Sequence, residues 1–238
     1  MATQTNARVT APDVAARKGG DAPLVMITAY DAPSARVVNA SGADMILVGD
    51  SLAMVVLGYD DTLQVTTADM AHHVAAVART QPHALVVGDL PWLSYHVSRD
   101  ETVHNAAMLI RAGAGAVKLE GGRKRIESVQ AILDAEIPVM GHLGLTPQSV
   151  HALGGFRVQG KQLESARAIV DDAVALAEAG CFAIVLECVP DAELVDGLRR
   201  EAEVTHHRDL GVEDRVDGVD PLAAALELHR GGTRAHEA

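Results

Sequence analysis

Six short apolar segments, each ending in a polar or charged residue, dominate the pattern of this chain. Their sequences are VMITAYD, MILVGDS, LVVGDLP, AVKLEGG, PVMGHLG and AIVLECV. The polar residues at their ends are Asp31, Asp50, Ser51, Asp89, Lys118, Glu120, His142 and Glu187. Apolar runs of this kind are typical of strands that are buried on both faces of a parallel sheet. A charge at the end of one run would be chance, but six in series predict strands whose carboxyl ends converge on one site.

Helical patterns separate these segments. We expect strands at 25–29, 45–48, 85–87, 116–119, 138–140 and 182–186. We expect helices at 12–18, 32–40, 67–79, 100–112, 125–135, 162–179 and 192–201. In the helix at 67–79, Thr67 is expected to be the capping residue, because an acid follows in the first turn. The alternation predicts an α/β fold with a parallel sheet. Six or more units that gather every strand end around one mouth favour a (β/α)8 barrel of the TIM type over an open doubly wound sheet.

Composition excludes several classes of function. The chain has 238 residues, with 32 acidic against 20 basic residues and a net charge of -12, which argues against a nucleic-acid partner. Apolar runs stay well short of the roughly 18–20 residues that span a bilayer, and the first residues lack a secretory signal pattern. Cys181 and Cys188 flank one strand too far apart for a disulfide, so we expect reduced, buried cysteines in a cytoplasmic protein.

Three acids at the strand ends indicate a cation site. Asp50 and Asp89 each follow an apolar strand and a glycine, and Glu120 lies two residues beyond Lys118. Three carboxylates at one mouth would repel each other unless they shared a cation, and ligands made only of oxygen suit Mg²⁺. The alternative is that each aspartate caps the turn or helix that follows it.

Lys118, Glu187 and His142 leave more than one interpretation open. Lys118 could hold a substrate carboxylate or carbonyl, form a Schiff base, or pair structurally with Glu120 or Asp89. Glu187 ends the most apolar strand, and burial there would raise the pKa of its carboxyl group and suit a general base. It could equally be satisfied by a helix N-terminus. His142 could orient a ligand, shuttle a proton or serve as a hydrogen-bonded core residue.

The longer segments resemble the ketopantoate hydroxymethyltransferase family. They are ITAYDAPSA, ILVGDSLAMVVLGYDDTLQVT, VVGDLPW, AGAGAVKLEGG, IPVMGHLGLTPQSV and IVLECVP, in family order over about residues 24–190. The resemblance implies a (β/α)8 barrel, Mg²⁺ and a cytoplasmic homo-oligomer. It implies transfer of a hydroxymethyl group from 5,10-methylenetetrahydrofolate to 3-methyl-2-oxobutanoate. The product is 2-dehydropantoate, formed through a Mg-stabilised enolate in pantothenate biosynthesis.

The resemblance also implies individual roles. Asp50, Asp89 and Glu120 match the family's metal residues, and the first two thereby contact the substrate. Ser51 and Lys118 match the residues that bind the keto acid. Glu187 matches the proton acceptor.

The last residues depart from the family pattern. We expect residues 1–20 to be a loose lead-in with one short helix, 21–203 to be the catalytic barrel and 204–238 to be an atypical tail. No strand-like run corresponds to a seventh or eighth strand, while residues 221–229 could form a helix. A shifted reading frame or truncation, irregular strands, and an oligomer that covers the gap are the competing explanations, of which the first is favoured.

Two other classes of function compete with this interpretation. One is a Mg-dependent barrel lyase or mutase acting on 2-oxo acids, related to phosphoenolpyruvate mutase or isocitrate lyase, although the catalytic cysteine loop of those enzymes is missing. The other is a catalytically impaired barrel that only associates with full-length subunits.

Overall fold

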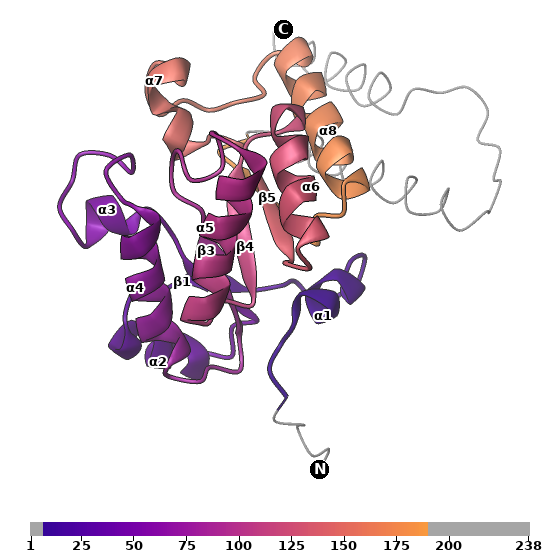
Figure 1. Cartoon of the computed structure of the whole chain (residues 1–238). Helices are drawn as coiled ribbons and strands as arrows, with labels where there is room; N and C mark the ends of the chain where they lie inside the picture. Colours follow the sequence, from indigo (N-terminus) through magenta and orange to yellow (C-terminus); the bar gives the residue numbers. More distant parts are fainter. Residues whose placement is uncertain (1–6, 190–238) are drawn as a thin grey trace, which may run out of the picture.

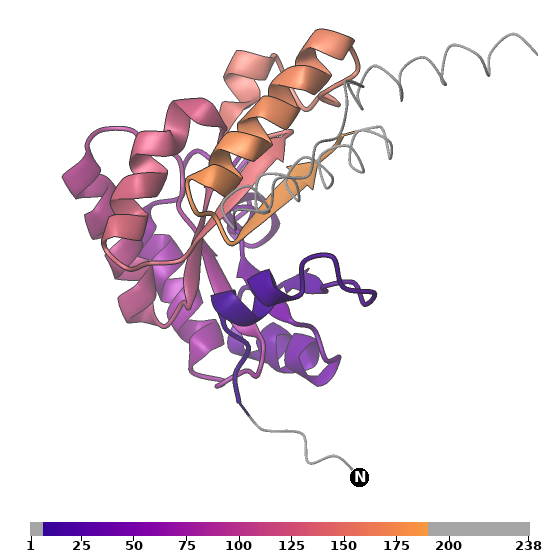
Figure 2. The same cartoon turned by 90° about the vertical axis from the view of Figure 1, so that its right-hand side faces the viewer.

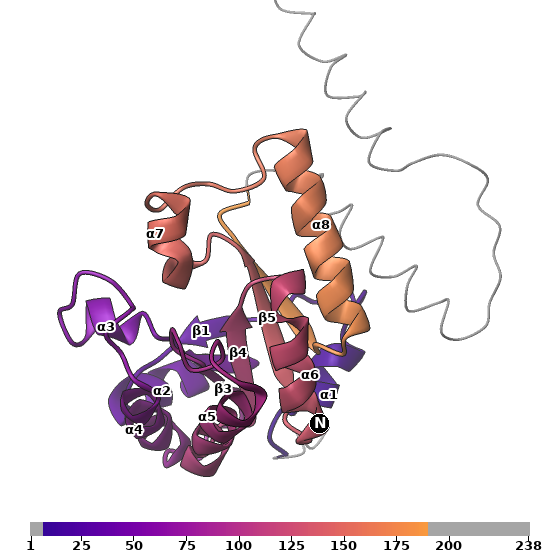
Figure 3. The ribbon, with the colours of Figure 1, turned by 45° about the horizontal axis from the view of Figure 1, so that its top comes forward.

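The computed structural model describes residues 7–189 of the chain. Its strands are β1 (Met26–Thr28), β2 (Met45–Val48), β3 (Leu85–Asp89), β4 (Ala116–Glu120), β5 (Val139–Gly144) and β6 (Ala183–Glu187). They form one parallel sheet in chain order, which curls with its helices on one side (Figures 1 and 3). This order is that of a barrel wall, because a doubly wound sheet would reverse its order at a switch point.

Helices follow the strands, largely where the sequence predicts them. They are α1 (Ala11–Ala16), α2 (Ala32–Ala40), α3 (Leu52–Val55), α4 (Thr67–Ala78), α5 (Arg99–Ala112), α6 (Ile126–Asp134), α7 (Val150–Leu153) and α8 (Leu163–Glu178). Two single turns of 3₁₀-helix, η1 (Arg123–Arg125) and η2 (Pro147–Ser149), precede α6 and α7. The prediction of Thr67 as a cap was wrong by one residue: the side chain of Thr66 accepts the backbone N–H of Asp69. The short helices α3 and α7 were not predicted.

The two faces of the sheet have different partners. Side chains alternate between the faces of a strand, so one set meets the helices and the other lines the inside of the curl. The outer set packs with helix residues in the main core, which includes Ile46, Val86, Val117, Leu119, Val139, Val74, Leu109, Ile132 and Leu176. The inner set forms a second apolar cluster that includes Met45, Leu85, Val87, Ala116 and Met140.

Helix α1 packs against the inner cluster. Ala11 and Val14 are buried with the strand residues of that cluster, and the backbone N–H of Val9 donates to the carbonyl of His83. Figure 2 shows α1 lying beside the amino-terminal ends of the strands. The lead-in that was expected to be loose therefore contains a packed helix, because burying two small apolar side chains fixes it to the sheet.

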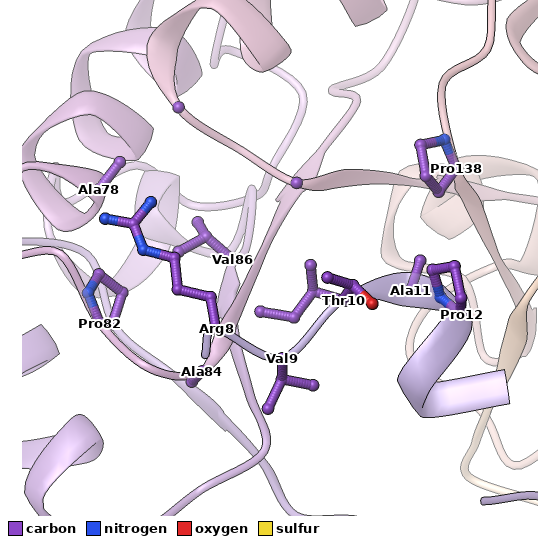
Figure 4. A pocket seen from close by; sticks show the side chains of 13 residues that line it. Arg8, Val9, Thr10, Ala11, Pro12, Ala78, Pro82, Ala84, Val86 and Pro138 are labelled. Carbon is purple, nitrogen blue, oxygen red and sulfur yellow. The ribbon is translucent and has the colours of Figure 1, made fainter. Parts of the chain in front are cut away.

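A crevice of about 270 Å³ lies between this segment and the loops that enter β3, β4 and β5. Arg8, Val9, Pro82, Val86 and Pro138 are among the side chains that line it (Figure 4). Because these residues lie at the amino-terminal ends of the strands, the crevice is at the opposite end from the polar strand ends.

The described sheet forms part of a barrel wall. Within residues 7–189, β1 pairs only with β2, and β6 pairs only with β5. The expected helix at 192–201 and the tail at 204–238 lie outside the described residues. Cys181 and Cys188 are free thiols, as predicted, but the expected burial was wrong, because Cys181 is partly exposed and Cys188, which follows the end of β6, is exposed. Among the described helices, none combines the length and apolar character needed to cross a membrane.

We predict that Gly113→Ala destabilises the fold more than Gly42→Ala does. Both glycines have positive φ angles, +112° and +80°, which cost other residues about 1–2 kcal/mol each. A Cβ at Gly113 would also lie 2.5 Å from the Cβ of Ala78 in α4, whereas nothing lies within 4 Å of one at Gly42. Urea unfolding should therefore give a loss of about 2–4 kcal/mol for Gly113→Ala against about 1–2 for Gly42→Ala. Equal losses would contradict the close contact between α4 and α5.

Candidate active site

The register of the parallel strands places the polar residues at their carboxyl ends in neighbouring pairs. Asp89 is paired with Lys118 across β3 and β4, and Glu120 is paired with His142 across β4 and β5. Glu187 at the end of β6 is paired with Gly144. Because Lys118 and Glu120 are two residues apart, both side chains leave the strand on the same face. The convergence predicted from the sequence is present for Asp50, Asp89, Lys118, Glu120, His142 and Glu187. It was wrong for Asp31, which is exposed and caps α2.

Lys118 is buried among carboxylates. Its Nζ lies 2.8 Å from Asp89 Oδ1, and both side chains are about 5% exposed or less. Burial lowers the pKa of Lys118, but Asp89, Glu120 and Asp50 more than offset that effect and leave the pKa above its ordinary value. The ammonium group is therefore charged at neutral pH, which suits binding of an anion and disfavours a nucleophilic amine.

Asp50 and Asp89 are neighbours in the buried site. The backbone N–H of Asp50 donates to Asp89 Oδ2 at 3.2 Å, and each residue is 3% exposed. Burial, followed by the charges of Asp89 and Glu120, raises the pKa of Asp50 from 3.8 to about 7. Burial also raises the pKa of Asp89, although Lys118 opposes that rise. Neither aspartate caps a helix, in contrast to Asp31, which accepts the backbone N–H of Ser34 at the start of α2.

Gln148 and Tyr95 complete the site and were missed in the sequence. Gln148 Nε2 donates to Asp50 Oδ2 at 2.8 Å, and its backbone N–H donates to Glu120 Oε2 at 3.0 Å. Tyr95 donates its hydroxyl to Gln148 Oε1 at 2.6 Å and accepts the backbone N–H of Glu120. Tyr95 lies in the loop after β3 and Gln148 lies in η2 after β5, and no local pattern marks them.

His142 links Glu120 to Glu187. Its Nδ1 lies 3.3 Å from Glu120 Oε1, and its Nε2 lies 3.2 Å from Glu187 Oε2. Burial lowers the pKa of His142. Glu120 and Glu187 raise that pKa by a larger amount, so it lies above its ordinary value. The expectation of a raised pKa for Glu187 was wrong. Its side chain is 43% exposed, and interaction with His142 lowers the pKa of the carboxyl group.

Ser51 lies at the edge of this cluster. Its Oγ is 2.9 Å from the hydroxyl of Tyr30, in the loop after β1. A Cβ on Gly49 would lie 2.8 Å from that Oγ and 3.5 Å from Asp89 Oδ2, so the glycine before Asp50 lets the backbone pass close to both side chains.

The acids fit a cation whose coordination shell is completed by a ligand from solution. Within residues 7–189, no three His, Cys, Asp or Glu side chains are gathered closely enough to hold a metal ion by themselves. Asp50 and Asp89 offer adjacent carboxylates, while Glu120 is engaged with His142 and Gln148. Mg²⁺ commonly takes one or two carboxylates and completes its octahedron with water and substrate oxygens. This donor set therefore suits Mg²⁺ better than a metal that needs a full protein cage.

The raised pKa of Asp50 predicts a pH dependence of stability. A folded carboxyl group with a pKa near 7 holds a proton that the unfolded chain releases near 3.8. Its contribution to stability is therefore full below pH 3.8 and is lost as the pH rises through 7. In EDTA, we compare the melting temperature of Asp50→Asn with that of the original chain at each pH. The variant's melting temperature minus that of the original chain should increase from pH 5 to pH 8. Asp134→Asn, at an exposed site, should follow the original chain. A constant difference for Asp50→Asn would contradict the shift.

Comparisons with known proteins show the family to which the chain belongs. The chain matches the family model for ketopantoate hydroxymethyltransferase over residues 8–204. A protein of Ignicoccus hospitalis named 3-methyl-2-oxobutanoate hydroxymethyltransferase is 57% identical over 197 residues, which cover 83% of this chain and 74% of the relative. A protein of the same name from Syntrophomonas wolfei is 56% identical over 199 residues, covering 83% and 72%.

A solved structure shows a related fold. 2,3-Dimethylmalate lyase, a member of the phosphoenolpyruvate mutase and isocitrate lyase superfamily, superposes with a TM-score of 0.58 at 19% identity. The match covers 95% of this chain and 82% of the lyase, and at this identity it concerns the fold alone. The family match ends at residue 204, close to the predicted start of the atypical tail. From the family match and the curated relatives, the chain belongs to the ketopantoate hydroxymethyltransferase family.

Proposed function

We propose that this chain transfers a hydroxymethyl group from 5,10-methylenetetrahydrofolate to 3-methyl-2-oxobutanoate and yields 2-dehydropantoate in pantothenate biosynthesis. The observation that carries the proposal is the buried group of Asp50, Asp89 and Lys118, in a chain whose relatives bear the name of that enzyme. The direct test is formation of 2-dehydropantoate by the purified chain from both substrates with Mg²⁺. The absence of product from folded protein would refute it.

Asp50 and Asp89 are the residues proposed to hold Mg²⁺, with Glu120 as the third acid. Glu120 would act from beside them, because its two oxygens already face His142 and the backbone N–H of Gln148. When bound, Mg²⁺ supplies Lewis acidity at the keto and carboxylate oxygens of the substrate. Gln148 holds Asp50 in place through its side-chain amide.

Lys118 and Ser51 are proposed to bind the keto acid. The charged ammonium of Lys118 faces the interior of the site and attracts the substrate carboxylate. The Ser51 hydroxyl is kept at the edge of the site by Tyr30 and offers one further hydrogen bond. Burial strengthens the interaction made by Lys118, because little water competes there.

Glu187 is proposed to accept the proton from C3 of the keto acid. Its lowered pKa keeps the carboxylate ionised at neutral pH, and His142 Nε2 at 3.2 Å favours that charged form. Because the side chain is 43% exposed, a water molecule could carry the proton between C3 and the carboxylate. Water adds to the methylene carbon of the folate, both of its C–N bonds break, and the two nitrogens take up the two hydrogens of water, which leaves tetrahydrofolate and formaldehyde. The carbanion at C3 then bonds to the formaldehyde carbon, and the proton taken from C3 ends on the resulting alkoxide oxygen as the hydroxyl.

Glu187→Gln is expected to lower the rate of exchange of the C3 hydrogen of 3-methyl-2-oxobutanoate by about 10²–10⁴-fold. The amide keeps the shape of the side chain but cannot accept the proton. Rates in deuterated buffer, followed by NMR, measure the effect at saturating Mg²⁺. Glu178→Gln, at an exposed position near the end of α8, is the matched control and should exchange at the original rate. Unchanged exchange by Glu187→Gln would remove Glu187 from this role.

We further propose that the chain forms a homo-oligomer. The segment after β2 supports this, because Val55, Val56, Leu57 and Tyr59 are 44–66% exposed on one short stretch of surface. Contiguous exposed apolar side chains of this kind are typical of protein interfaces. Light scattering on the purified chain would distinguish an oligomer from a monomer.

A further inference from the structure

Two cations lie beside the site and form no salt bridge in the part of the chain that the structure describes. They are Lys124 and Arg125, in the 3₁₀ turn between β4 and α6. Their neighbour Arg123 differs, because its guanidinium group lies 2.7 Å from Asp172 and 3.3 Å from Asp171. In a chain with a net charge of -12, a pair of uncompensated cations indicates attraction for an anion from outside.

Unpaired buried nitrogens accompany these cations. The Nδ1 atom of His96 and the Nε atom of Arg125 are buried, and neither has a hydrogen-bond partner among the described residues. The His96 ring packs on Tyr95 with 4.2 Å between ring centres, and the guanidinium carbon of Arg125 lies 5.8 Å from the Tyr95 ring centre. Burial, then Arg125 and Lys124, lower the pKa of His96 to about 4, so the histidine adds no charge at neutral pH.

The loop glycine Gly121 allows this arrangement. It has a φ angle of +116°, and a Cβ there would lie 2.9 Å from Cγ of Arg125 and 3.7 Å from Cε of Lys124. The stems of both long side chains therefore lie across the backbone of the loop directly after β4. This keeps the two cations close to the carboxyl end of that strand, where Glu120 lies.

Tyr95 joins the cations to the active site. Its ring contacts His96 and Arg125, while its hydroxyl donates to Gln148 and accepts the backbone N–H of Glu120. The Tyr95 side chain therefore lies between Arg125 and the site residues Gln148 and Glu120. Lys118 already supplies the cation inside it, so a second cationic group at the rim suits a longer reactant with an anionic end.

We propose that His96, Lys124 and Arg125 form a subsite for the glutamate carboxylates of the folate co-substrate. The inference rests on the proposed function, because a folate is the reactant that reaches the site with an anionic tail. Trp92 and Leu93 lie in the same loop as His96 and are 39% and 45% exposed, which offers apolar surface to the aromatic part of such a molecule.

The test compares folates with one and three glutamates in the complete reaction. Lys124→Gln together with Arg125→Gln should raise KM for 5,10-methylenetetrahydrofolate by about fivefold, as expected for the loss of two partly exposed ion pairs. The rise should be larger with three glutamates and should shrink at high salt. Arg123→Gln is the matched control, because its charge is already neutralised, and it should leave KM near the original value. Lys124→Gln alone avoids disturbing the Arg125–Tyr95 contact.

A second assay keeps the outcomes distinct. Exchange of the C3 hydrogen of the keto acid needs no folate, so the double variant should exchange at the original rate if the proposal is right. An unchanged KM for both folates, or a change equal to that of Arg123→Gln, would overturn the subsite. Loss of exchange in the double variant would overturn it as well, because the cations would then support the keto-acid site. Absence of exchange in the original chain would instead refute the proposed function.

Discussion

Replacing Asp50 and Asp89 together with asparagine should abolish Mg²⁺-dependent exchange at C3 of 3-methyl-2-oxobutanoate, with a loss of at least about a thousandfold. The substitutions keep the size of both side chains but remove two charges from a buried site, where each is 3% exposed. Titration calorimetry should show weak or no Mg²⁺ binding by this variant. The variant should also lose stability, because Asp89→Asn removes the carboxylate beside the buried Lys118. Exchange is therefore compared at a temperature at which circular dichroism shows the variant to be folded.

Asp134→Asn provides the comparison for this experiment. Asp134 forms an ion pair with Arg99, and the side chain of Asp134 is 74% exposed. Loss of this ion pair should change the rate of exchange little. Full exchange by the Asp50 and Asp89 double variant in the absence of metal would refute the proposed metal site. Retained Mg²⁺ affinity with lost exchange would place the ion elsewhere.

Lys118→Met should be the most destabilising single change in the site, at about 3–5 kcal/mol near neutral pH. The substitution removes the cation that lies 2.8 Å from Asp89 and leaves buried carboxylates without compensation. Without that cation, burial raises the pKa of Asp89 further. The folded protein then holds protons that the unfolded chain releases at lower pH, so stability is greatest in acid and is lost as the pH rises.

Urea unfolding at pH 5.5 and pH 8 in EDTA measures this dependence. The cost of Lys118→Met should be clearly smaller at pH 5.5 than at pH 8. Lys161→Met removes a charge from an exposed loop and should cost little at either pH. A cost for Lys118→Met that is small and independent of pH would contradict the electrostatic account of the buried group.

The sequence was sufficient to predict the strands and the charged residues at their ends. Each strand is a short apolar run, and the acid or lysine that follows it is visible without knowing any distant contact. In-register pairing of β3, β4 and β5 then brings Asp89 beside Lys118 and Glu120 beside His142. The convergence follows from the topology, because sequential parallel strands carry their carboxyl ends to the same edge.

Other features depend on contacts that no local pattern shows. Tyr95 lies in a loop and Gln148 in the short turn η2, and their place in the site is fixed by hydrogen bonds to residues 25–98 positions away in the chain. The lowered pKa of Glu187 depends on His142 in the neighbouring strand, so an argument from the hydrophobicity of its own strand gave the wrong direction. Helix α1 was predicted, but its burial against the inner cluster depends on the curl of the sheet.

Deuterium exchange at C3 of 3-methyl-2-oxobutanoate by the purified 238-residue chain tests the central claim most directly. It requires the metal residues, the keto-acid site and the proton acceptor together, and it does not depend on folate. We predict exchange that requires Mg²⁺ and disappears with EDTA. A cooperatively folded chain that binds the keto acid but gives no exchange with Mg²⁺ would contradict the account and favour a barrel that only associates with other subunits.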